Sequence, residues 1–171
     1  MSYPDPRYLG DKGEISAVLR PANAEPDLTT SSGSYHYLAT TVSTGGEFGL
    51  YRVNMAPKGG GPSTHFHKTI SESFFILSGT VRLFDGERWI DATAGDFLYV
   101  PVGGLHAFRN DSNESASMLL LFAPGAPRER YFEGLTEVAQ LSDEERMRFF
   151  IEHDSYFIAE QHTRGGWTSK D

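Results

Sequence analysis

The chain has 171 residues, of which 39% are hydrophobic, and it contains no cysteine. It carries 15 Lys and Arg against 23 Asp and Glu, which gives a net charge of −8 at pH 7 with histidine neutral. The length fits one domain with a core that needs no crosslinks. The missing cysteine excludes disulfides, thiolate metal sites and cysteine nucleophiles.

The acidic balance argues against a nucleic-acid partner, whose phosphates need a basic face. No apolar run is long enough to span a membrane. The first residues lack the charged and apolar segments of a secretion signal, so the sequence predicts a cytoplasmic protein.

The chain opens with a segment of little hydrophobic periodicity, residues 1–34, which is rich in Pro, Gly, Ser and Thr. A short amphipathic stretch from Ile15 to Leu19 ends at Pro21. We predict an arm here that lies on the domain or on a partner subunit. It contains no helix-turn-helix pattern.

The next segment, residues 35–124, alternates short apolar runs with turns. Gly45-Gly46, Ser78-Gly79 and Asp85-Gly86 are typical turn pairs. Aromatic and β-branched residues are frequent in eight predicted strand segments, 35–42, 47–55, 72–77, 80–84, 88–90, 97–100, 106–109 and 118–122. Short strands without intervening helices predict an all-β domain, a small antiparallel barrel or sandwich.

The predicted elements after Pro124 are helical, and we expect a helical appendage over residues 125–160. Apolar spacing predicts one helix over 128–139. Ser142 to Glu145 fits a capping box that opens a second helix, with Met147, Phe150 and Ile151 on one face and Phe149 flanking it. The polar end, residues 161–171, is predicted to be a flexible tail.

The first candidate site is His65-Phe66-His67. Residues i and i+2 of a strand point to the same face, so both imidazoles could reach one ion. Taken alone, such a pair is as often structural as functional. Three other histidines match no motif, and we expect packed or surface side chains at His36, His153 and His162.

Two spaced motifs surround this pair. The first, G-x5-HxH-x4-E-x6-G, runs through Gly59, His65, His67, Glu72 and Gly79. The second, G-x5-PxG-x2-H-x3-N, comprises Gly95, Pro101, Gly103, His106 and Asn110. With all ten positions matched, the sequence over about residues 35–122 resembles the cupin superfamily, loosely the single-domain, quercetinase-like members.

This resemblance implies a small antiparallel jelly-roll β-barrel with a metal ion in its mouth. The implied ligands are His65, His67, Glu72 and His106, and Asn110 is expected to tie a loop. Imidazole and carboxylate donors suit one divalent transition-metal ion, which could be Fe, Mn, Ni, Co, Cu or Zn. Four protein ligands leave room for water, substrate or dioxygen.

Glu72 has a second role in the quercetinase-like group, where the motif glutamate also accepts the proton of a substrate hydroxyl. Ligand-only and catalytic roles both stay open for Glu72 at this point. Side chains alternate between the two faces of a strand, so Phe74 and Ile76 are expected on the same face as Glu72, and Phe108 on the same face as His106.

Further residues could line the cavity or cap its mouth. Core packing or a solvated surface is the more usual role for such side chains. The residues in question are Tyr51, Arg52, Tyr99, Phe122, Arg128, Arg130, Tyr131 and Phe132.

The sequence favours a metal-dependent dioxygenase that acts on an aromatic or polyphenolic small molecule, with dioxygen as co-substrate. One alternative is a metal-dependent isomerase, cyclase or lyase for a small metabolite or polyketide. Another is a non-catalytic binding protein. A homodimer is expected, because cupins commonly pair and small barrels have sheet edges to cover.

Overall fold

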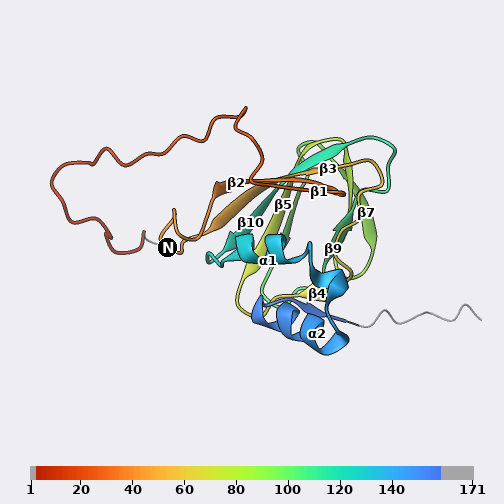
Figure 1. Ribbon diagram of the computed structural model, residues 1–171. Helices are drawn as coiled ribbons and strands as arrows, with labels where there is room; N and C mark the ends of the chain where they lie inside the picture. Colours follow the sequence, from red (N-terminus) through yellow and green to blue (C-terminus); the bar gives the residue numbers. More distant parts are fainter. Residues whose placement is uncertain (1–2, 159–171) are drawn as a thin grey trace, which may run out of the picture.

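Antiparallel strands make up most of the structure, a computed structural model that describes residues 3–158 (Figure 1). The strands are β1 (Leu28–Thr30), β2 (Gly33–Ala39), β3 (Gly49–Met55), β4 (His65–Phe66), β5 (Ser71–Ser78), β6 (Thr80–Phe84), β7 (Trp89–Thr93), β8 (Phe97–Val100), β9 (Ala107–Arg109), β10 (Ala116–Ala123) and β11 (Tyr156–Phe157). Between β10 and β11 lie α1 (Arg128–Gly134), a 3₁₀ turn (Val138–Gln140) and α2 (Asp143–Glu152).

Two sheets enclose the core. The larger has the strand order β1-β2-β3-β10-β5-β8, and the smaller has the order β7-β6-β9. Buried residues alternate with partly exposed ones along β3 and β10, as expected for strands with one face on a core. Tyr51, Phe74 and Met118 from the larger sheet pack in one cluster with Val81 and Leu83 from the smaller. The prediction of an all-β fold with a short helical appendage is confirmed.

The predicted turns join the predicted strands. β2 pairs with β3 across the turn that contains Gly45-Gly46. β6 pairs with β7 across Asp85-Gly86, where Gly86 has φ +100° and the Asp85 carboxylate accepts two backbone N–H groups. Each of the eight predicted strand segments contains a strand, whereas β1, β4 and β11 lie outside these segments.

The first helix is shorter than predicted, because α1 ends at Gly134 instead of continuing to Ala139. The chain then turns so that α2 folds back onto α1. A Cβ on Gly134 would lie 2.5 Å from the Phe149 ring, so any larger residue there would require this ring to move. The Tyr131 and Phe149 rings stack at 5.8 Å between the two helices.

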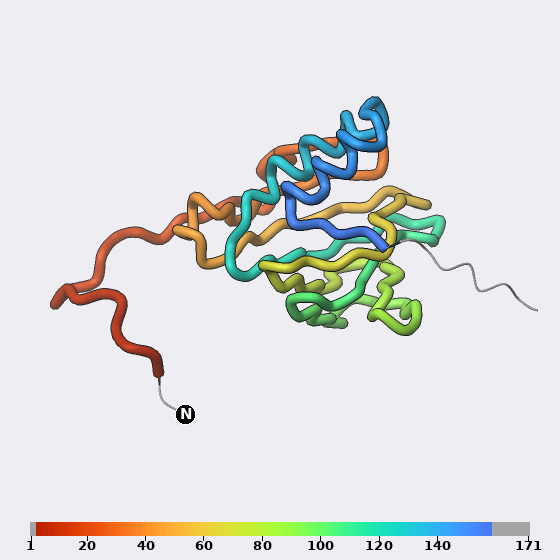
Figure 2. Tube along the Cα trace, turned by 90° about the horizontal axis from the view of Figure 1, so that it is seen from below, coloured from red at the N-terminus to blue at the C-terminus, as the bar shows by residue number. Residues whose placement is uncertain are grey.

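The second helix begins as predicted, with Ser142 as its N-cap and both bonds of the capping box formed with Glu145. Its predicted apolar face is partly wrong: Phe150 does pack against the core with Phe149, but Met147 and Ile151 are exposed. The helix contacts α1 through Phe149 and β11 through Phe150, so these two residues form its partly buried face. Figure 2 shows α1 and α2 together on one side of the domain, with the β11 segment running back beside β4.

The arm leaves the domain as an extended segment without helix or strand until β1 pairs with β2 (Figure 1). Ile15, Val18 and Leu19 of its amphipathic stretch are exposed.

None of the helices in the described part of the chain is long and apolar enough to cross a membrane. The predicted tail, residues 161–171, lies outside the described residues. The domain boundaries and the cytoplasmic location stay predictions.

Candidate metal centre and its cavity

Segments from three different sheets bring the candidate ligands together. His65 and His67 lie at β4, Glu72 lies on β5 and His106 precedes β9. Residues 65 and 106 are joined as an antiparallel bridge, with two backbone hydrogen bonds of 3.0 Å. The four side chains are buried, and one ligand atom from each lies within 4.8 Å of the others.

Backbone carbonyls fix the orientation of all three imidazoles. The Nδ1 of His65 donates to the Ser63 carbonyl at 3.0 Å, and that of His106 donates to the Gly104 carbonyl at 2.9 Å. The Nδ1 of His67 donates to the Asp154 carbonyl at 2.5 Å. A carbonyl oxygen can only accept, so each Nδ1 carries a proton and each Nε2 is free to ligate.

The arrangement around Glu72 fits a divalent cation. Its Oε2 lies 2.8 Å from His106 Nε2 and 3.1 Å from His67 Nε2. In the neutral tautomer that the Nδ1 bonds select, each Nε2 bears a lone pair, as does the carboxylate. These nitrogen and oxygen lone pairs repel one another at such distances unless a proton or a cation lies between them. Imidazole nitrogens with one carboxylate are the ligands of first-row divalent metals.

Burial and neighbouring charges shift the ionisation of these groups. Burial, followed by the charge of His106, lowers the pKa of His65 to about 3, so this imidazole is neutral near pH 7. Burial alone would raise the pKa of Glu72. Where a proton occupies Nε2 of His106 and His67, their hydrogen bonds to this carboxylate and their positive charges outweigh burial and hold the pKa of Glu72 well below its usual value. Glu72 is therefore a carboxylate, as a metal ligand must be.

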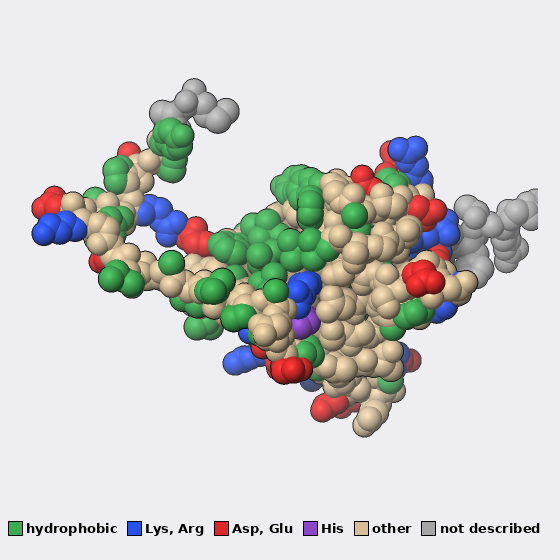
Figure 3. All heavy atoms as spheres, turned by 90° about the horizontal axis from the view of Figure 1, so that it is seen from above, with side chains coloured by type: hydrophobic (Ala, Val, Ile, Leu, Met, Phe, Trp, Pro, Cys, Tyr) green, Lys and Arg blue, Asp and Glu red, His purple; other side chains and the backbone are tan. Residues whose placement is uncertain are grey.

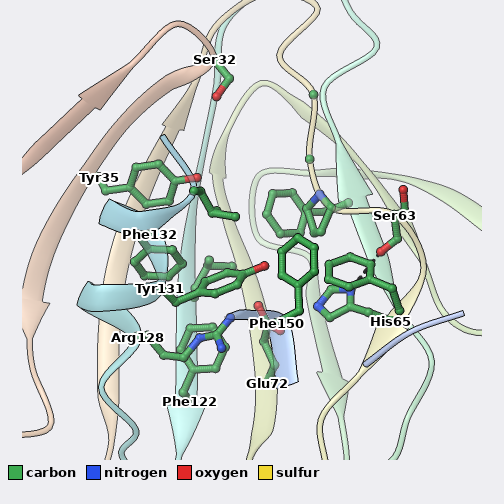
Figure 4. Close-up of a pocket in the computed structure, with 17 residues that line it drawn as sticks. Ser32, Tyr35, Ser63, His65, Glu72, Phe122, Arg128, Tyr131, Phe132 and Phe150 are labelled. Carbon is green, nitrogen blue, oxygen red and sulfur yellow. Dashed lines mark hydrogen bonds between the residues drawn. The ribbon is translucent and has the colours of Figure 1, made fainter. Parts of the chain in front are cut away.

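A cavity of about 470 Å³ opens onto His65 and Glu72. It lies between the β-sheets and the helical appendage, and Figure 4 shows aromatic rings along much of its wall. Its lining residues are Ser32, Tyr35, Gly60, Gly61, Pro62, Ser63, His65, Glu72, Phe108, Leu120, Phe122, Arg128, Tyr131, Phe132, Leu135, Phe150 and Phe157. A pocket of this size and apolar character suits an organic ligand with an aromatic body.

Several predicted cavity residues do line this wall. Phe108 and Phe122 come from β9 and β10, and Arg128, Tyr131 and Phe132 come from α1. Arg128 is only 4% exposed, so the expectation of a solvated face at this position is wrong.

Other candidates lie elsewhere. Phe74 and Ile76 share the buried face of Glu72 as parity predicts, but they pack in the core, as does Tyr51. Tyr99 is 57% exposed, and Arg130 is exposed as well. Arg52 is partly buried and does not line the cavity.

The cavity contains residues that the sequence reading missed. Tyr35 on β2 stacks on Phe132 at 4.8 Å, and Phe157 on β11 stacks on His65 at 5.1 Å. Phe150 lies against Phe157 at 4.5 Å. No motif marks these positions, and β11 is too short for a periodic signal.

The remaining motif and histidine predictions concern structural roles. Asn110 donates to the carbonyls of Ala56 and Glu114 and accepts from Ser112, which confirms that it ties loops. His36 is buried beside Asn54, and His153 caps α2, so neither is a ligand of this centre. His162 lies outside the described residues.

The C-terminal segment holds one candidate ligand directly. Asp154, with φ +52°, offers its carbonyl to His67. Its carboxylate accepts from the backbone N–H groups of Lys68 and Thr69 at 2.9 Å each, and from the Thr69 hydroxyl at 2.7 Å. We call residues 154–158, which continue into the β11–β4 pairing, the C-terminal clasp.

Part of the chain matches a known protein family and individual proteins. Residues 51–122 match the family described as Cupin domain. Quercetin 2,3-dioxygenase from Bacillus subtilis (strain 168) is 30% identical over 113 residues, which cover 66% of this chain and 33% of that protein. The match thus spans about a third of that relative's length. Polyketide synthase CurC from Streptomyces cyaneus is 27% identical over 124 residues, covering 72% of this chain and 80% of that one.

Among solved structures, the crystal structure of ectoine synthase from P. lautus has a TM-score of 0.57 at 14% identity. It covers 90% of this chain and 99% of that chain, and the likeness concerns the fold. The matched family, the two motifs and the fold agree, and the chain belongs to the cupin superfamily.

Proposed function

We propose that this protein is a metal-dependent dioxygenase that acts on an aromatic or polyphenolic small molecule. One divalent transition-metal ion would be held by His65, His67, Glu72 and His106. The observation that carries the proposal is the aromatic cavity of about 470 Å³ that ends at Glu72 and His65. The partial match to a quercetin dioxygenase supports the same reading.

Each side of the cavity has a function in this proposal. The bound ion, whether Fe, Mn, Ni, Co, Cu or Zn, would supply Lewis acidity that favours loss of a proton from a substrate hydroxyl. Glu72, a carboxylate on the cavity wall, accepts this proton. The rings of Tyr131, Phe132 and Phe150 hold a flat substrate and exclude water.

Oxygen consumption tests the proposal. The protein is loaded anaerobically with Fe(II), Mn(II), Co(II), Ni(II) or Cu(II) in turn and then given oxygen with a panel of flavonols and catechols. We expect substrate-dependent oxygen uptake with at least one metal. Absence of uptake with every metal and substrate would rule out this activity.

A second candidate is a metal-dependent isomerase or cyclase for a polyketide. The match to a polyketide synthase protein favours it, because that match covers most of both chains. The same ligands would then polarise a carbonyl, and Glu72 would move a proton between carbon and oxygen. Product formation under argon, without oxygen uptake, identifies this candidate.

A further inference from the structure

A buried arginine in the cavity wall has no acidic partner. Arg128 is 4% exposed, and no carboxylate of residues 3–158 lies within 4.0 Å of its nitrogens. Buried charges in proteins are usually paired, because transfer of an unpaired ion from water is costly. The side chain therefore has a charge that the described protein does not neutralise.

The hydrogen bonds of Arg128 occupy only some of the N–H donors of its guanidinium. Its Nη1 donates to the His153 carbonyl at 2.7 Å and to the Ser155 hydroxyl at 3.4 Å. Its Nε is buried and has no hydrogen-bond partner among the described residues. Since a guanidinium carries five N–H donors, capacity remains for another acceptor.

Aromatic rings also lie against the guanidinium of Arg128. The guanidinium carbon lies 3.9 Å from the ring centroid of Tyr131 and 4.9 Å from that of Phe122. These rings attract the cation but accept none of its strong hydrogen bonds. Figure 4 shows the guanidinium pointing into the cavity, toward the side on which Glu72 lies.

We propose that Arg128 binds a carboxylate of the substrate, so that the cavity selects aromatic hydroxy acids. This inference deepens the proposed function, because it assigns the substrate class of the same cavity. Arg128 is the only Lys or Arg among the lining residues. Its planar fork matches a carboxylate through two parallel hydrogen bonds, which a lysine could not provide.

The positions of Arg128 and Glu72 in the cavity define how the substrate would be oriented. Its carboxylate lies at Arg128, its aromatic body lies among the rings of Tyr131, Phe132 and Phe150, and its hydroxyl points to the end of the cavity with His65 and Glu72. In the metal-free protein Glu72 would repel a carboxylate at that end, so the two charges at the wall favour one orientation.

Binding measurements on the full chain test this assignment without relying on turnover. Calorimetric titrations use 6-hydroxy-2-naphthoate, whose two groups lie at opposite ends of the rings, and its neutral amide, with metal-free protein and with Zn²⁺-loaded protein. We expect the wild-type protein to bind the carboxylate about tenfold or more tightly than the amide. Arg128→Met removes this preference, while Arg128→Lys keeps part of it.

The matched control is Arg130→Met, an exposed arginine on the same helix, which leaves the preference unchanged. A purely structural Arg128 would change both affinities equally or unfold the protein. Equal wild-type affinity for the carboxylate and the amide overturns the inference, even if Arg128→Met does not fold. So does a folded Arg128→Met variant that keeps the preference.

These outcomes are separable from those of the proposed function. A carboxylate preference without oxygen uptake keeps the assignment of Arg128 and rejects the dioxygenase. Oxygen uptake with neutral polyphenols, together with equal affinities for the naphthoate and its amide, keeps the dioxygenase and rejects the assignment.

Discussion

At the scale of single residues, the imidazoles of the candidate metal centre are oriented by main-chain carbonyls. His65, His67 and His106 each donate Nδ1–H to a carbonyl, which leaves the Nε2 of each ring as its candidate ligand atom before any ion binds. The cost of orienting the ligands is thus met during folding, which favours tight metal binding.

The role of Glu72 can be separated from ligation. Glu72→Gln keeps the size and an oxygen donor but loses the charge and the basicity. We expect weaker metal binding and, at saturating metal, a kcat for oxygen uptake lower by about 10²–10⁴-fold, the usual contribution of a general base. Elemental analysis reports metal occupancy, and oxygen electrodes report kcat.

Glu87→Gln, in an exposed turn, is the control and leaves both quantities unchanged. If the Glu72→Gln variant at full metal occupancy turned over at the wild-type rate, Glu72 would be a ligand only.

At the scale of elements, the strands and the clustering of the candidate ligands were predictable, but only part of the cavity wall was. The turn pairs Ser78-Gly79 and Asp85-Gly86 mark the ends of β5 and β6 in the sequence, and the two motifs mark the candidate ligands. The stacking of Tyr35 on Phe132 joins β2 to α1 across distant positions, and no local pattern reports it. Arg128 looked solvated because its neighbours Glu129 and Arg130 are charged, whereas the turn of α1 buries only the first of the two arginines.

The C-terminal clasp should control metal affinity. Asp154→Gly keeps the left-handed backbone but loses the carboxylate that anchors residues 68 and 69. We expect metal affinity to fall by about 10–100-fold, the usual effect of losing a group that orients a ligand. Competition with a chelating dye measures it.

Asp143→Ala is the control for this variant, because that side chain is 99% exposed at the start of α2 and pairs with Arg146 of the same helix. It should bind metal as the wild type does. Unchanged affinity in Asp154→Gly would show that the backbone contact to His67 holds the ligand alone.

At the scale of the whole molecule, hydrophobic side chains remain uncovered. Ile15 and Val18 of the arm are 109% and 94% exposed, and Phe97 on the edge strand β8 is 62% exposed. Figure 3 shows hydrophobic side chains along the arm and on the adjoining surface of the domain. Exposed apolar residues and a free sheet edge are typical of surfaces that associate.

We therefore predict a homodimer in which the arm covers a second copy. A truncation that begins at Arg20 removes the exposed stretch but keeps β1 and the 2.6 Å ion pair of Arg20 with Asp27. Size-exclusion chromatography with light scattering should show a dimer for the full chain and a monomer for the truncation. A truncated protein that stays dimeric would leave the β8 edge as the interface.

Alkaline titration should report on the packing around α1. Burial raises the pKa of Tyr35 to about 12, and it also raises the pKa of Tyr37, Tyr51 and Tyr131. Their neutral forms are favoured in the fold. This stabilisation is present in full below the unfolded pKa near 10 and is lost as the pH rises through about 12.

Ultraviolet absorbance should therefore show these tyrosines ionising together with the loss of far-ultraviolet circular dichroism. In Tyr35→Phe, one fewer group should ionise in that step. Ionisation of all 8 tyrosines near pH 10 with native circular dichroism would contradict the predicted packing.

The C-terminal clasp also bears on when, during synthesis, the protein can bind its metal ion. The carbonyl that orients His67 lies 87 residues further along the chain. During synthesis the ribosome releases both histidine motifs well before Asp154, so a nascent chain has the ligands but lacks the contact that holds one of them in place. Metal capture at full affinity is then confined to chains whose β11 segment has emerged and docked. Unfinished chains would release an ion acquired too early.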